Sequence, residues 1–325
     1  MDVFALFGHL LPVEHNTGVL CVALSPSVDV TYLVDGFAVG GTSRPHTVVR
    51  VPGGKGFNVA RAARALGTPV VAAGIVGGHA GRWIAARLEA DAVPVALVDG
   101  SVETRTCVSV GAADGSLTEV YEHATPVTPG EWAQLVEVVR RTPAGWVALS
   151  GSAPAGAPAG AVAALIDAAR EHGARIALDT HGPALAATVD LADVVKVNAA
   201  EAAELLGVDA PAAELAAGVL ATTSRPAVVV VTAGGDGAVA AVRHSPELTW
   251  VRPPALAARY PVGSGDSFLA GLLSVLTVAP DAVPDALRRA VAAGSANALE
   301  PGAACFDPLA VTELAGRVEI SPSAR

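Results

Sequence analysis

The chain has 325 residues, a formal net charge of −10 and 52% hydrophobic residues, while charged residues make up only 16%. An apolar chain of this length can bury a large core, which excludes an intrinsically disordered protein. Binding to nucleic acid or to an anionic membrane needs a concentrated basic surface, and no run of Lys and Arg occurs in the sequence. We therefore expect a packed, enzyme-sized protein with no nucleic-acid or membrane partner.

Cysteine usage and the N-terminal segment both favour a cytoplasmic protein. Cys21, Cys107 and Cys305 are far apart and odd in number, so neither a disulfide framework nor a zinc cluster is indicated. The apolar stretch 4–11 is short and is interrupted by glycine and histidine, which does not fit a signal peptide. Apolar runs elsewhere break before the roughly 20 residues that a membrane helix requires. We interpret residues 1–16 as an N-terminal extension.

Short runs of β-branched residues alternate with Ala/Leu-rich segments that have helical spacing. In chain order the predicted elements are strand Val19–Leu24, helix Asn58–Leu66, strand Val70–Val76, helix Arg82–Ala90, strand Trp146–Leu149, helix Pro158–His172, strand Arg175–Leu178, strand Val194–Val197, helix Ala199–Leu206, helix Ala212–Thr222 and strand Ala227–Val231. Parallel strands need crossover connections. The alternation therefore predicts an α/β fold with a doubly wound, mostly parallel sheet flanked by helices.

Two segments, 28–51 and 104–123, interrupt this rhythm. Each contains alternating, half-exposed strands with no helix between them, joined by turns at Asp35-Gly36 and at Asp114-Gly115. They predict a small β-sheet lid that projects from the main body. The length suggests about two domains, but no linker or internal repeat is visible. We therefore predict a single domain over residues 17–325 that includes this lid.

A glycine-rich segment precedes the first predicted helix, which is expected to start near Asn58. Gly53, Gly54 and Gly56 surround Lys55, but a P-loop needs Ser or Thr directly after its lysine, and Gly56 stands there. Glycines allow backbone N–H groups to approach a ligand closely, and a helix N-terminus favours anionic atoms. The segment predicts a ligand-binding loop, and the alternative interpretation is a tight turn.

The segment 261–273 is the most informative. Gly263 and Gly265 lead into an apolar helix whose first turn carries Asp266 and Ser267. Amides at such a helix start can bind a developing negative charge, and a carboxylate in the same turn can accept a hydroxyl proton. Asp266 or Ser267 could instead only cap the helix. Capping does not explain why two glycines precede them.

Two further motifs each allow a structural interpretation. Asn198 and Glu201 follow a predicted strand, where they either form a capping box or face a phosphate and the water shell of a metal ion. Gly235-x-Gly237 matches part of a dinucleotide fingerprint, but the sequence that follows is β-like and lacks the required acidic residue. We expect a turn between strands there, with Thr232 and the loop amides available to a phosphate.

Taken together, these motifs resemble the signatures of the PfkB, or ribokinase-like, carbohydrate kinases. The resemblance runs from about Val19 to Pro308 through Gly53-Gly54-Lys55-Gly56-x-Asn58, Asn198-x-x-Glu201, Thr232-x-Gly234-x-x-Gly237 and Gly263-x-Gly265-Asp266. Other segments resemble the hexose-phosphate branch, which includes 1-phosphofructokinase and tagatose-6-phosphate kinase. They are Ser25-Pro-x-x-Asp29, Glu103-Thr-Arg105-Thr, Thr118-Glu119 and Asp179-Thr-x-Gly182.

The resemblance implies an ATP- and Mg²⁺-dependent kinase that acts on a sugar or sugar phosphate. Asp266 would be the base, with the amides of Gly263, Ser264, Gly265 and Asp266 as the anion hole. The expected substrate-binding residues are Asp29, Gly53, Gly54, Lys55, Asn58 and Arg105, the last of these and Lys55 holding a substrate phosphate. The expected ATP-binding residues are Lys196, Asn198, Thr232, Gly234, Gly237 and Asn297, with Glu201 contacting Mg²⁺ through water. A monovalent cation such as K⁺ and a homodimer formed through the lid would also fit the family.

The sequence departs from the hexose-phosphate branch at the substrate pocket. Cys107 stands where that branch often has asparagine, and Thr118 to Thr125 differ from its usual Thr-Glu-x-Asn-x-Pro-Gly-Pro. The prediction of a ketohexose phosphate as acceptor therefore stands beside two alternatives, a kinase of an unphosphorylated sugar or nucleoside and a non-catalytic sugar-phosphate or nucleotide sensor. Retention of Asp266 and Glu201 argues against the sensor, which would not need a base.

Overall fold

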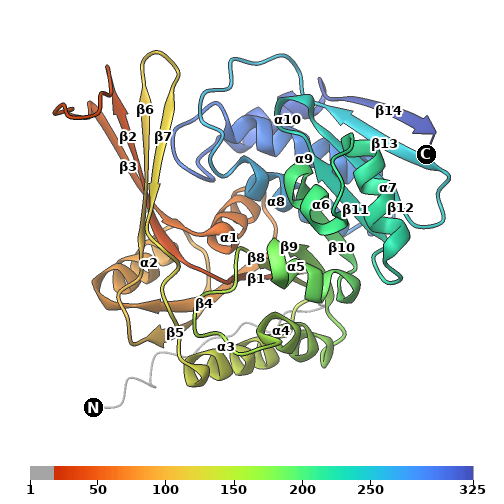
Figure 1. The fold of residues 1–325 in the computed structure, drawn as a ribbon, viewed down its shortest axis with the longest axis horizontal. Helices are drawn as coiled ribbons and strands as arrows, with labels where there is room; N and C mark the ends of the chain where they lie inside the picture. Colours follow the sequence, from red (N-terminus) through yellow and green to blue (C-terminus); the bar gives the residue numbers. More distant parts are fainter. Residues whose placement is uncertain (1–17, 325) are drawn as a thin grey trace.

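A computed structural model describes residues 18–324 of the chain. The predicted extension over residues 1–16 lies outside the described residues. Within them, a ten-stranded sheet forms the body of the molecule (Figure 1). In spatial order its strands are β14 (Glu319–Ala324), β13 (Glu247–Arg252), β12 (Ala238–Val242), β11 (Val228–Thr232), β10 (Val194–Asn198), β9 (Arg175–Asp179), β8 (Trp146–Ser150), β1 (Val19–Ala23), β4 (Val70–Gly77) and β5 (Val95–Gly100).

The prediction of a mostly parallel sheet is confirmed. Every neighbouring pair from β5 to β11 is parallel, whereas β11 to β14 pair antiparallel. Each predicted strand of the body is present, with ends that differ by no more than one residue. Strands β5, β13 and β14 are absent from the sequence prediction. Two of them, β5 and β14, form the edges of the sheet, and β5 and β13 carry charged residues instead of a continuous apolar run.

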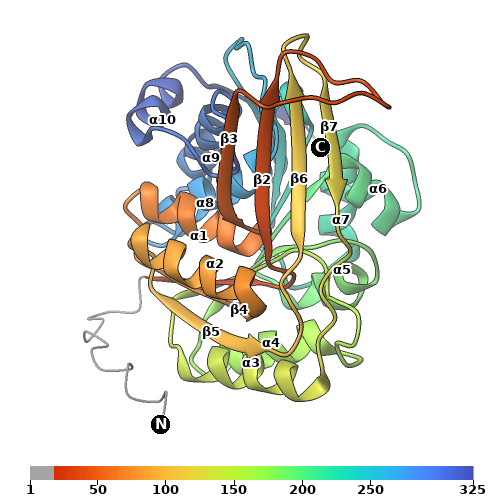
Figure 2. The same cartoon turned by 90° about the vertical axis from the view of Figure 1, so that its left-hand side faces the viewer.

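The predicted lid is a separate four-stranded sheet, whose strands stand side by side in Figure 2. Its order is β3 (Thr47–Gly53), β2 (Ser27–Val34), β6 (Thr106–Ala112) and β7 (Leu117–Tyr121). The turn at Asp114-Gly115 is confirmed, since Gly115 has φ 87° and donates to the carbonyl of Ala112. The prediction of a turn between strands at Asp35-Gly36 is wrong. These residues begin a long loop that extends to Thr47, so the connection between β2 and β3 does not require a tight turn.

Helices cover both faces of the large sheet, as predicted. Those that pack into one core cluster are α1 (Lys55–Ala65), α2 (Gly78–Ala90), α8 (Ser264–Leu276), α9 (Val283–Asn297) and α10 (Pro308–Ala315). Those of the opposite face are α3 (Pro129–Arg141), α4 (Ala161–Arg170), α5 (Gly182–Thr188), α6 (Ala199–Leu206) and α7 (Ala212–Thr222). The predictions for α6 and α7 are confirmed residue for residue, while α4 is shorter than predicted because its first turn begins after Gly160.

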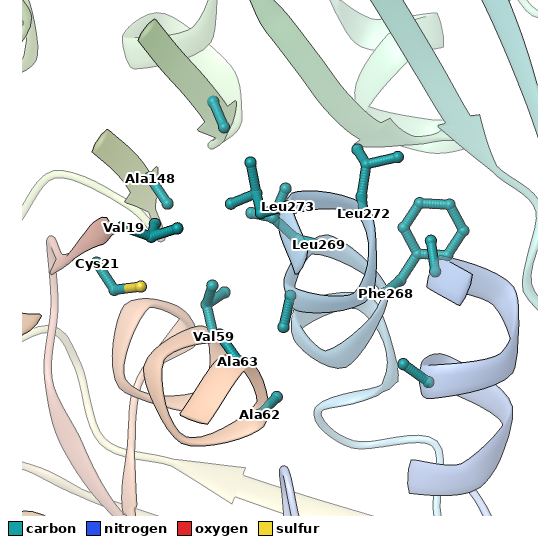
Figure 3. Close-up of a cluster of buried hydrophobic side chains, with 14 of the residues drawn as sticks. Val19, Cys21, Val59, Ala62, Ala63, Ala148, Phe268, Leu269, Leu272 and Leu273 are labelled. Atoms are coloured by element: carbon teal, nitrogen blue, oxygen red, sulfur yellow. The ribbon is translucent and has the colours of Figure 1, made fainter. Parts of the chain in front are cut away.

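The core beneath the lid is formed by α1 and α8 against the central strands. Figure 3 shows Leu269 and Leu273 of α8 facing Val59 of α1 and Val19 of β1. Small residues allow the helices to approach closely: a Cβ on Gly271 would lie 2.7 Å from a carbonyl oxygen of α9. Close packing fixes the N-terminal ends of α1 and α8 relative to the sheet. The N-termini of both helices are therefore held in fixed positions, at the side of the molecule where the cavity described below lies.

The two faces of the lid differ in what they contact. Asp29 of β2 pairs with Cys107 of β6, which in turn pairs with Tyr121 of β7, so these side chains share one face. That face looks onto the body, as the cavity described below shows. The opposite face carries alternate apolar residues, among them Val48 and Val120, which are 39% and 64% exposed.

Candidate active site

A cavity of about 480 Å³ lies between the lid and the carboxyl ends of the parallel strands. In open α/β sheets ligands bind at this edge, because loops after successive strands converge there. The last residues of β10 and β11, and residues of the loops that follow β1, β8 and β9, contribute to its wall. The described lining residues are Ser25, Ser27, Asp29, Gly54, Lys55, Asn58, Arg105, Cys107, Tyr121, Gly151, Ser152, His181, Lys196, Asn198, Thr232, Val262, Gly263, Gly265 and Asp266.

The glycine-rich segment turns the chain directly into α1. Gly54 has φ 85°, and a Cβ there would lie 2.6 Å from the carbonyl oxygen of Ser25. The helix therefore begins at Lys55, and the prediction of a start near Asn58 is wrong. A side chain on Gly53 would collide with the carboxyl group of Asp29. The segment is thus a close-approach loop that a simple turn does not explain.

Asp29 projects from the lid strand β2 toward the cavity. Its Oδ1 accepts a hydrogen bond of 2.6 Å from the hydroxyl of Ser27. Burial raises the pKa of Asp29 above its ordinary value, although hydrogen bonds and nearby Arg105 act in the opposite direction. The lid therefore presents a largely buried carboxyl group to any ligand in the cavity.

A buried network of charges lies beside the glycine-rich loop. The carboxylate of Asp179 is fully buried and accepts from Lys55 Nζ at 2.9 Å and from Lys196 Nζ at 2.8 Å. Lys55 Nζ also lies 3.5 Å from Glu201 Oε1. Burial raises the pKa of Asp179, but the two lysines outweigh it and hold that pKa below its ordinary value. Burial lowers the pKa of Lys55, while Asp179 and Glu201 outweigh it and raise that pKa.

Asp266 lies in the first turn of α8, as predicted, but it does not cap the helix. The N-cap residue is Gly263, and no side chain caps this end. Asp266 Oδ2 instead accepts a 2.9 Å hydrogen bond from Nδ2 of Asn58. Burial and the nearby negative charge of Asp179 raise the pKa of Asp266 to about 6. A carboxyl group with a pKa of this size can accept and release a proton near neutral pH.

Two glycines, Gly263 and Gly265, keep the start of α8 open. Gly263 has φ 82°, and a Cβ there would lie 2.6 Å from the Cβ of Ala303. A Cβ on Gly265 would lie 2.9 Å from Nζ of Lys196. The first amides of a helix have no partners within the helix and carry a partial positive charge. Together with Lys196, the amides of Gly263, Ser264, Gly265 and Asp266 can therefore stabilise an anion, although the amide of Ser264 also donates to the carbonyl of Pro261 at 3.0 Å.

The motif at the start of α6 forms the capping box that was one of its two interpretations. Asn198 accepts from the amide of Glu201 at 2.9 Å, and Glu201 Oε2 accepts from the amide of Asn198 at 2.9 Å. Asn198 also lines the cavity, and Glu201 Oε1 remains directed at Lys55. The capping role and a role toward a ligand are therefore compatible.

The predicted nucleotide loop is the turn between β11 and β12. Gly234–Asp236 forms one short 3₁₀ turn, and Gly237 has φ 96°. The strands on either side are antiparallel, so the exclusion of a dinucleotide fingerprint is confirmed. Thr232 reaches the cavity, whereas Gly234 and Gly237 are not part of its lining within residues 18–324.

Asn297, expected at the ATP site, is fully buried behind the start of α8. Its Nδ2 donates to the carbonyl of Val262 at 2.8 Å and to the hydroxyl of Ser264 at 3.1 Å. Its Oδ1 accepts from the amide of Ala304 at 2.7 Å and from the hydroxyl of Ser267 at 3.3 Å. The side chain thus joins α9 to the start of α8 and to the loop that packs on it.

We expect Asn297→Leu to destabilise the protein by about 2–4 kcal/mol, because buried polar groups of Val262 and Ala304 would lose their partner. Urea unfolding measures this loss. Ser274→Ala is the matched control: it removes one half-buried hydrogen bond of α8, to the carbonyl of Gly271, and its loss should be smaller. If Asn297→Leu unfolded like wild type and only its KM for ATP rose, the direct ATP contact implied by the family would be the better explanation.

Arg105 lines the lid side of the cavity, where its guanidinium bonds to the backbone. It donates to the carbonyl of Glu122 at 3.1 Å, of Ser25 at 3.2 Å and of Pro26 at 3.4 Å. Cys107, where the sequence departs from the hexose-phosphate branch, lies beside it on the same face as Asp29. Burial raises the pKa of the Cys107 thiol, which is therefore neutral at physiological pH.

Some residues of the cavity were not among the predicted site residues. Ser152, His181 and Tyr121 belong to this group. Asp179, noted only as part of a motif, does not line the cavity but pairs with Lys55, which does. Asp179 ends β9, and Ser152 and His181 lie in the loops that follow β8 and β9, so their position at the carboxyl edge of the sheet was a usable signal. Tyr121 lies in the lid, where only the paired strand register reveals that it faces the cavity.

Comparison with known proteins places the chain in a family. The model of the pfkB family carbohydrate kinases matches residues 16–308. The chain belongs to the PfkB family. Phosphofructokinase-2 from Escherichia coli in its tetrameric inhibited form is 28% identical, with a TM-score of 0.83, and the match covers 92% of this chain and 98% of that chain. The same enzyme in complex with fructose-6-phosphate gives the same values.

A protein from Thermotoga maritima described as a possible 1-phosphofructokinase is 22% identical, with a TM-score of 0.85, over 94% of this chain and 99% of that chain. At this identity the likeness shows the fold, which is the α/β fold with a small separate sheet described above. The PfkB match and the phosphofructokinase neighbours together make this chain an ATP-dependent sugar kinase, as predicted. In the part of the chain that the structure describes, no helix is long and apolar enough to span a membrane.

The family implies ATP and Mg²⁺, and the residues present fit a magnesium ion held mainly by phosphate and water. Among residues 18–324, no group of three or more His, Cys, Asp or Glu side chains could form a protein cage for a metal ion. Mg²⁺ at phosphoryl-transfer sites usually takes one or two carboxylates, with water and substrate phosphates as its other ligands. Glu201 supplies a partly exposed carboxylate at the edge of this PfkB site.

Proposed function

We propose that this PfkB kinase transfers the γ-phosphoryl group of ATP to a hydroxyl of a ketohexose phosphate. The observation that carries the proposal is the position of Asp266. Its carboxylate lies in the cavity wall at the start of α8, beside the helix-start amides and Lys196, and its pKa is raised to about 6. A base beside an anion-binding helix start is what transfer to a hydroxyl requires.

Asp266 would take the proton of the acceptor hydroxyl while the oxygen of that hydroxyl attacks the γ-phosphorus. The bond to the β-phosphate oxygen of ATP breaks in the same step, and ADP leaves with that electron pair. The amides of Gly263 to Asp266 would stabilise the charge on the transferred group, and Lys196 would add a fixed positive charge there. Such transfer depends on positioning and charge stabilisation, and it needs no covalent intermediate with the protein.

Polar atoms in the cavity support a hydroxyl-rich acceptor. Within residues 18–324, Ser25 Oγ and Asn58 Oδ1 are buried without a hydrogen-bond partner, and both residues line the cavity. Buried polar atoms are normally paired, so a bound ligand is the natural partner for them. We propose that Asp29, Gly53, Gly54 and Asn58 hold the hydroxyls of the sugar.

On the nucleotide side we propose that ATP binds along Lys196, Asn198, Thr232 and the turn that contains Gly234 and Gly237. Glu201 would hold Mg²⁺ through water. When bound, the ion neutralises charge on the phosphates and fixes their orientation. Asn297 would support this region from behind the start of α8, because its side chain is already fully hydrogen-bonded.

Cationic side chains in the cavity favour a substrate that already carries a phosphate. Lys55, Arg105 and Lys196 all line it, in a chain whose net charge is −10. We propose that Arg105, with Lys55, holds this phosphate. A kinase of an unphosphorylated sugar remains the second candidate, since the guanidinium of Arg105 already donates to three backbone carbonyls.

An ATP-consumption assay over a panel of acceptors tests the proposal. The panel contains fructose 1-phosphate, fructose 6-phosphate, tagatose 6-phosphate, free hexoses and nucleosides, each measured with and without K⁺, since the E. coli relative was solved with potassium. We expect the highest kcat/KM on a ketohexose phosphate. A higher value on a free hexose would favour the second candidate, and no turnover on any acceptor would contradict the proposal.

We also propose that the face of the lid opposite the one that carries Asp29 pairs with a second copy of the chain. Val48 and Val120 are exposed on this face, and an exposed apolar sheet needs cover. Sedimentation velocity should give the mass of a dimer or larger assembly for the wild type and of a monomer for Val48→Arg/Val120→Arg. Val278→Arg, on an exposed residue of the body, is the matched control. A monomeric wild type would contradict this arrangement.

A further inference from the structure

Asn58 connects the lid to the base. It lies in the second turn of α1 with only 4% of its surface exposed. Its Nδ2 donates to Asp266 Oδ2 at 2.9 Å, across 208 residues of sequence. The Asn58 side chain also lies near Asp29 on β2, where it acts to lower the pKa of that carboxyl group. One amide therefore bonds to the base and lies beside the carboxyl group of the lid.

These neighbours fix the orientation of the Asn58 amide. An ionised carboxylate only accepts hydrogen bonds, so the NH₂ group of Asn58 must face Asp266. The amide oxygen then points elsewhere, and among the described residues it has no hydrogen-bond partner although it is buried. A buried oxygen without a hydrogen-bond partner lowers the stability of the fold. An asparagine with a purely structural role would be expected to have both its amide groups paired.

The same contact fixes which oxygen of Asp266 is available. Oδ2 accepts the hydrogen bond from Asn58. Among the described residues, no side chain or amide donates a hydrogen bond to Oδ1. Around this carboxylate the charged groups are Asp179, Lys55 and Lys196, and Asn58 supplies the side-chain hydrogen bond. Of these, only Asn58 is a neutral donor that can set the orientation of the carboxylate without adding charge.

We infer that Asn58 is the positioning residue of the base: it holds Asp266 through Oδ2 so that Oδ1 faces the acceptor hydroxyl. The inference rests on the proposed function, in which Asp266 is the base. In the same arrangement Asn58 Oδ1 accepts from a neighbouring hydroxyl of the sugar. Asn58 therefore sets the reacting hydroxyl and the base relative to each other.

A pH profile of kcat in Asn58→Leu tests this role. Leucine has a similar size but cannot donate, so the pKa of Asp266 should rise and the acid limb of kcat should move up by about one pH unit. The plateau of kcat should fall by about 10²-fold, because the carboxylate is no longer held in place. The matched control is Ser27→Ala, which removes a donor to Asp29 and leaves Asp266 untouched. It should raise KM without moving the acid limb.

An acid limb in Asn58→Leu that matches wild type would overturn the inference. If that variant does not fold, as judged by thermal unfolding, Asn58→Ser is measured in the same way, since its short side chain cannot make the 2.9 Å contact. Asp266→Asn distinguishes a failure of the base assignment from a failure of the positioning role alone. If Asp266→Asn keeps the wild-type rate, the base assignment itself fails. If it is inactive while the folded Asn58 variant shows the wild-type limb, only the positioning role fails.

Discussion

Asp266→Asn should lower kcat by a factor on the order of 10²–10⁴, which is the usual contribution of a positioned general base. The amide can still accept the hydrogen bond from Asn58, so the fold and the affinity for ATP should be kept. Steady-state kinetics with the best acceptor, together with calorimetric titration of ATP, measures both quantities. A variant near the wild-type rate would mean that Asp266 has only a structural role.

The same substitution should stabilise the protein at neutral pH. Burial and Asp179 raise the pKa of Asp266 from 3.8 to about 6, so the folded state binds a proton more tightly than the unfolded state. The stability contributed by this group therefore falls as the pH rises through that window. Asp266→Asn removes the effect and should gain on the order of 1–3 kcal/mol at pH 7. The gain should vanish below about pH 4, and urea unfolding at the two pH values checks this.

In the wild type, the protonation of Asp266 should also limit the rate in acid. Because the base must be ionised, kcat should fall as the pH drops through about 6, the pKa of this carboxyl group. The acid limb should disappear in Asp266→Asn, whose residual rate should not depend on pH in this range.

Asp179→Asn should be the most destabilising single change in the site, with a loss of about 3–5 kcal/mol. The carboxylate is fully buried and pairs with Lys55 and Lys196, and the amide would leave Lys196 without its ion-pair partner and Lys55 with only the more distant Glu201. The lysines hold the pKa of Asp179 below its ordinary value. Its contribution to stability is therefore present above the pKa of the unfolded state and is lost as the pH falls through the folded pKa.

Asp285→Asn is the matched control for this experiment. Asp285 also forms an ion pair, with Arg288 at 2.7 Å, but both side chains are exposed, so its loss should stay below about 1 kcal/mol. Equal losses for the two variants in urea unfolding would show that the buried network does not hold the site together. A second readout is the acid limb of kcat, which should move down in Asp179→Asn because a negative charge beside Asp266 is removed.

The body of the fold was predictable because its strands are continuous β-branched runs. A strand buried on both faces carries a nearly unbroken apolar run, as in β1, β8 and β11, and β10 keeps this pattern apart from Lys196. Edge strands such as β5 carry charged residues and alternate less clearly, so they were missed. The start of α1 was misplaced because a helix that begins directly after a glycine with positive φ has no capping side chain to mark it.

The candidate site was predictable where a local motif fixes the position of a residue. Asp266 and Gly54 belong to this group, since their positions depend on the turn that precedes a helix. The pairing of Asp179 with two lysines depends instead on which strands are neighbours, since β9 pairs with β10 while Lys55 starts α1. For Asn297 the family resemblance implies an ATP contact, whereas its five hydrogen bonds around the start of α8 depend on the folded chain and could not be predicted from the sequence.

Identification of the product by ³¹P NMR tests the central claim most directly. The enzyme is incubated with ATP, Mg²⁺ and each ketohexose phosphate in turn, with Asp266→Asn as the control. We predict that one acceptor gives a second phosphomonoester signal on the sugar, in equal amount to the ADP formed, and that the control gives neither. Formation of ADP with inorganic phosphate alone, or of a phosphomonoester only on unphosphorylated sugars, would contradict the proposed function.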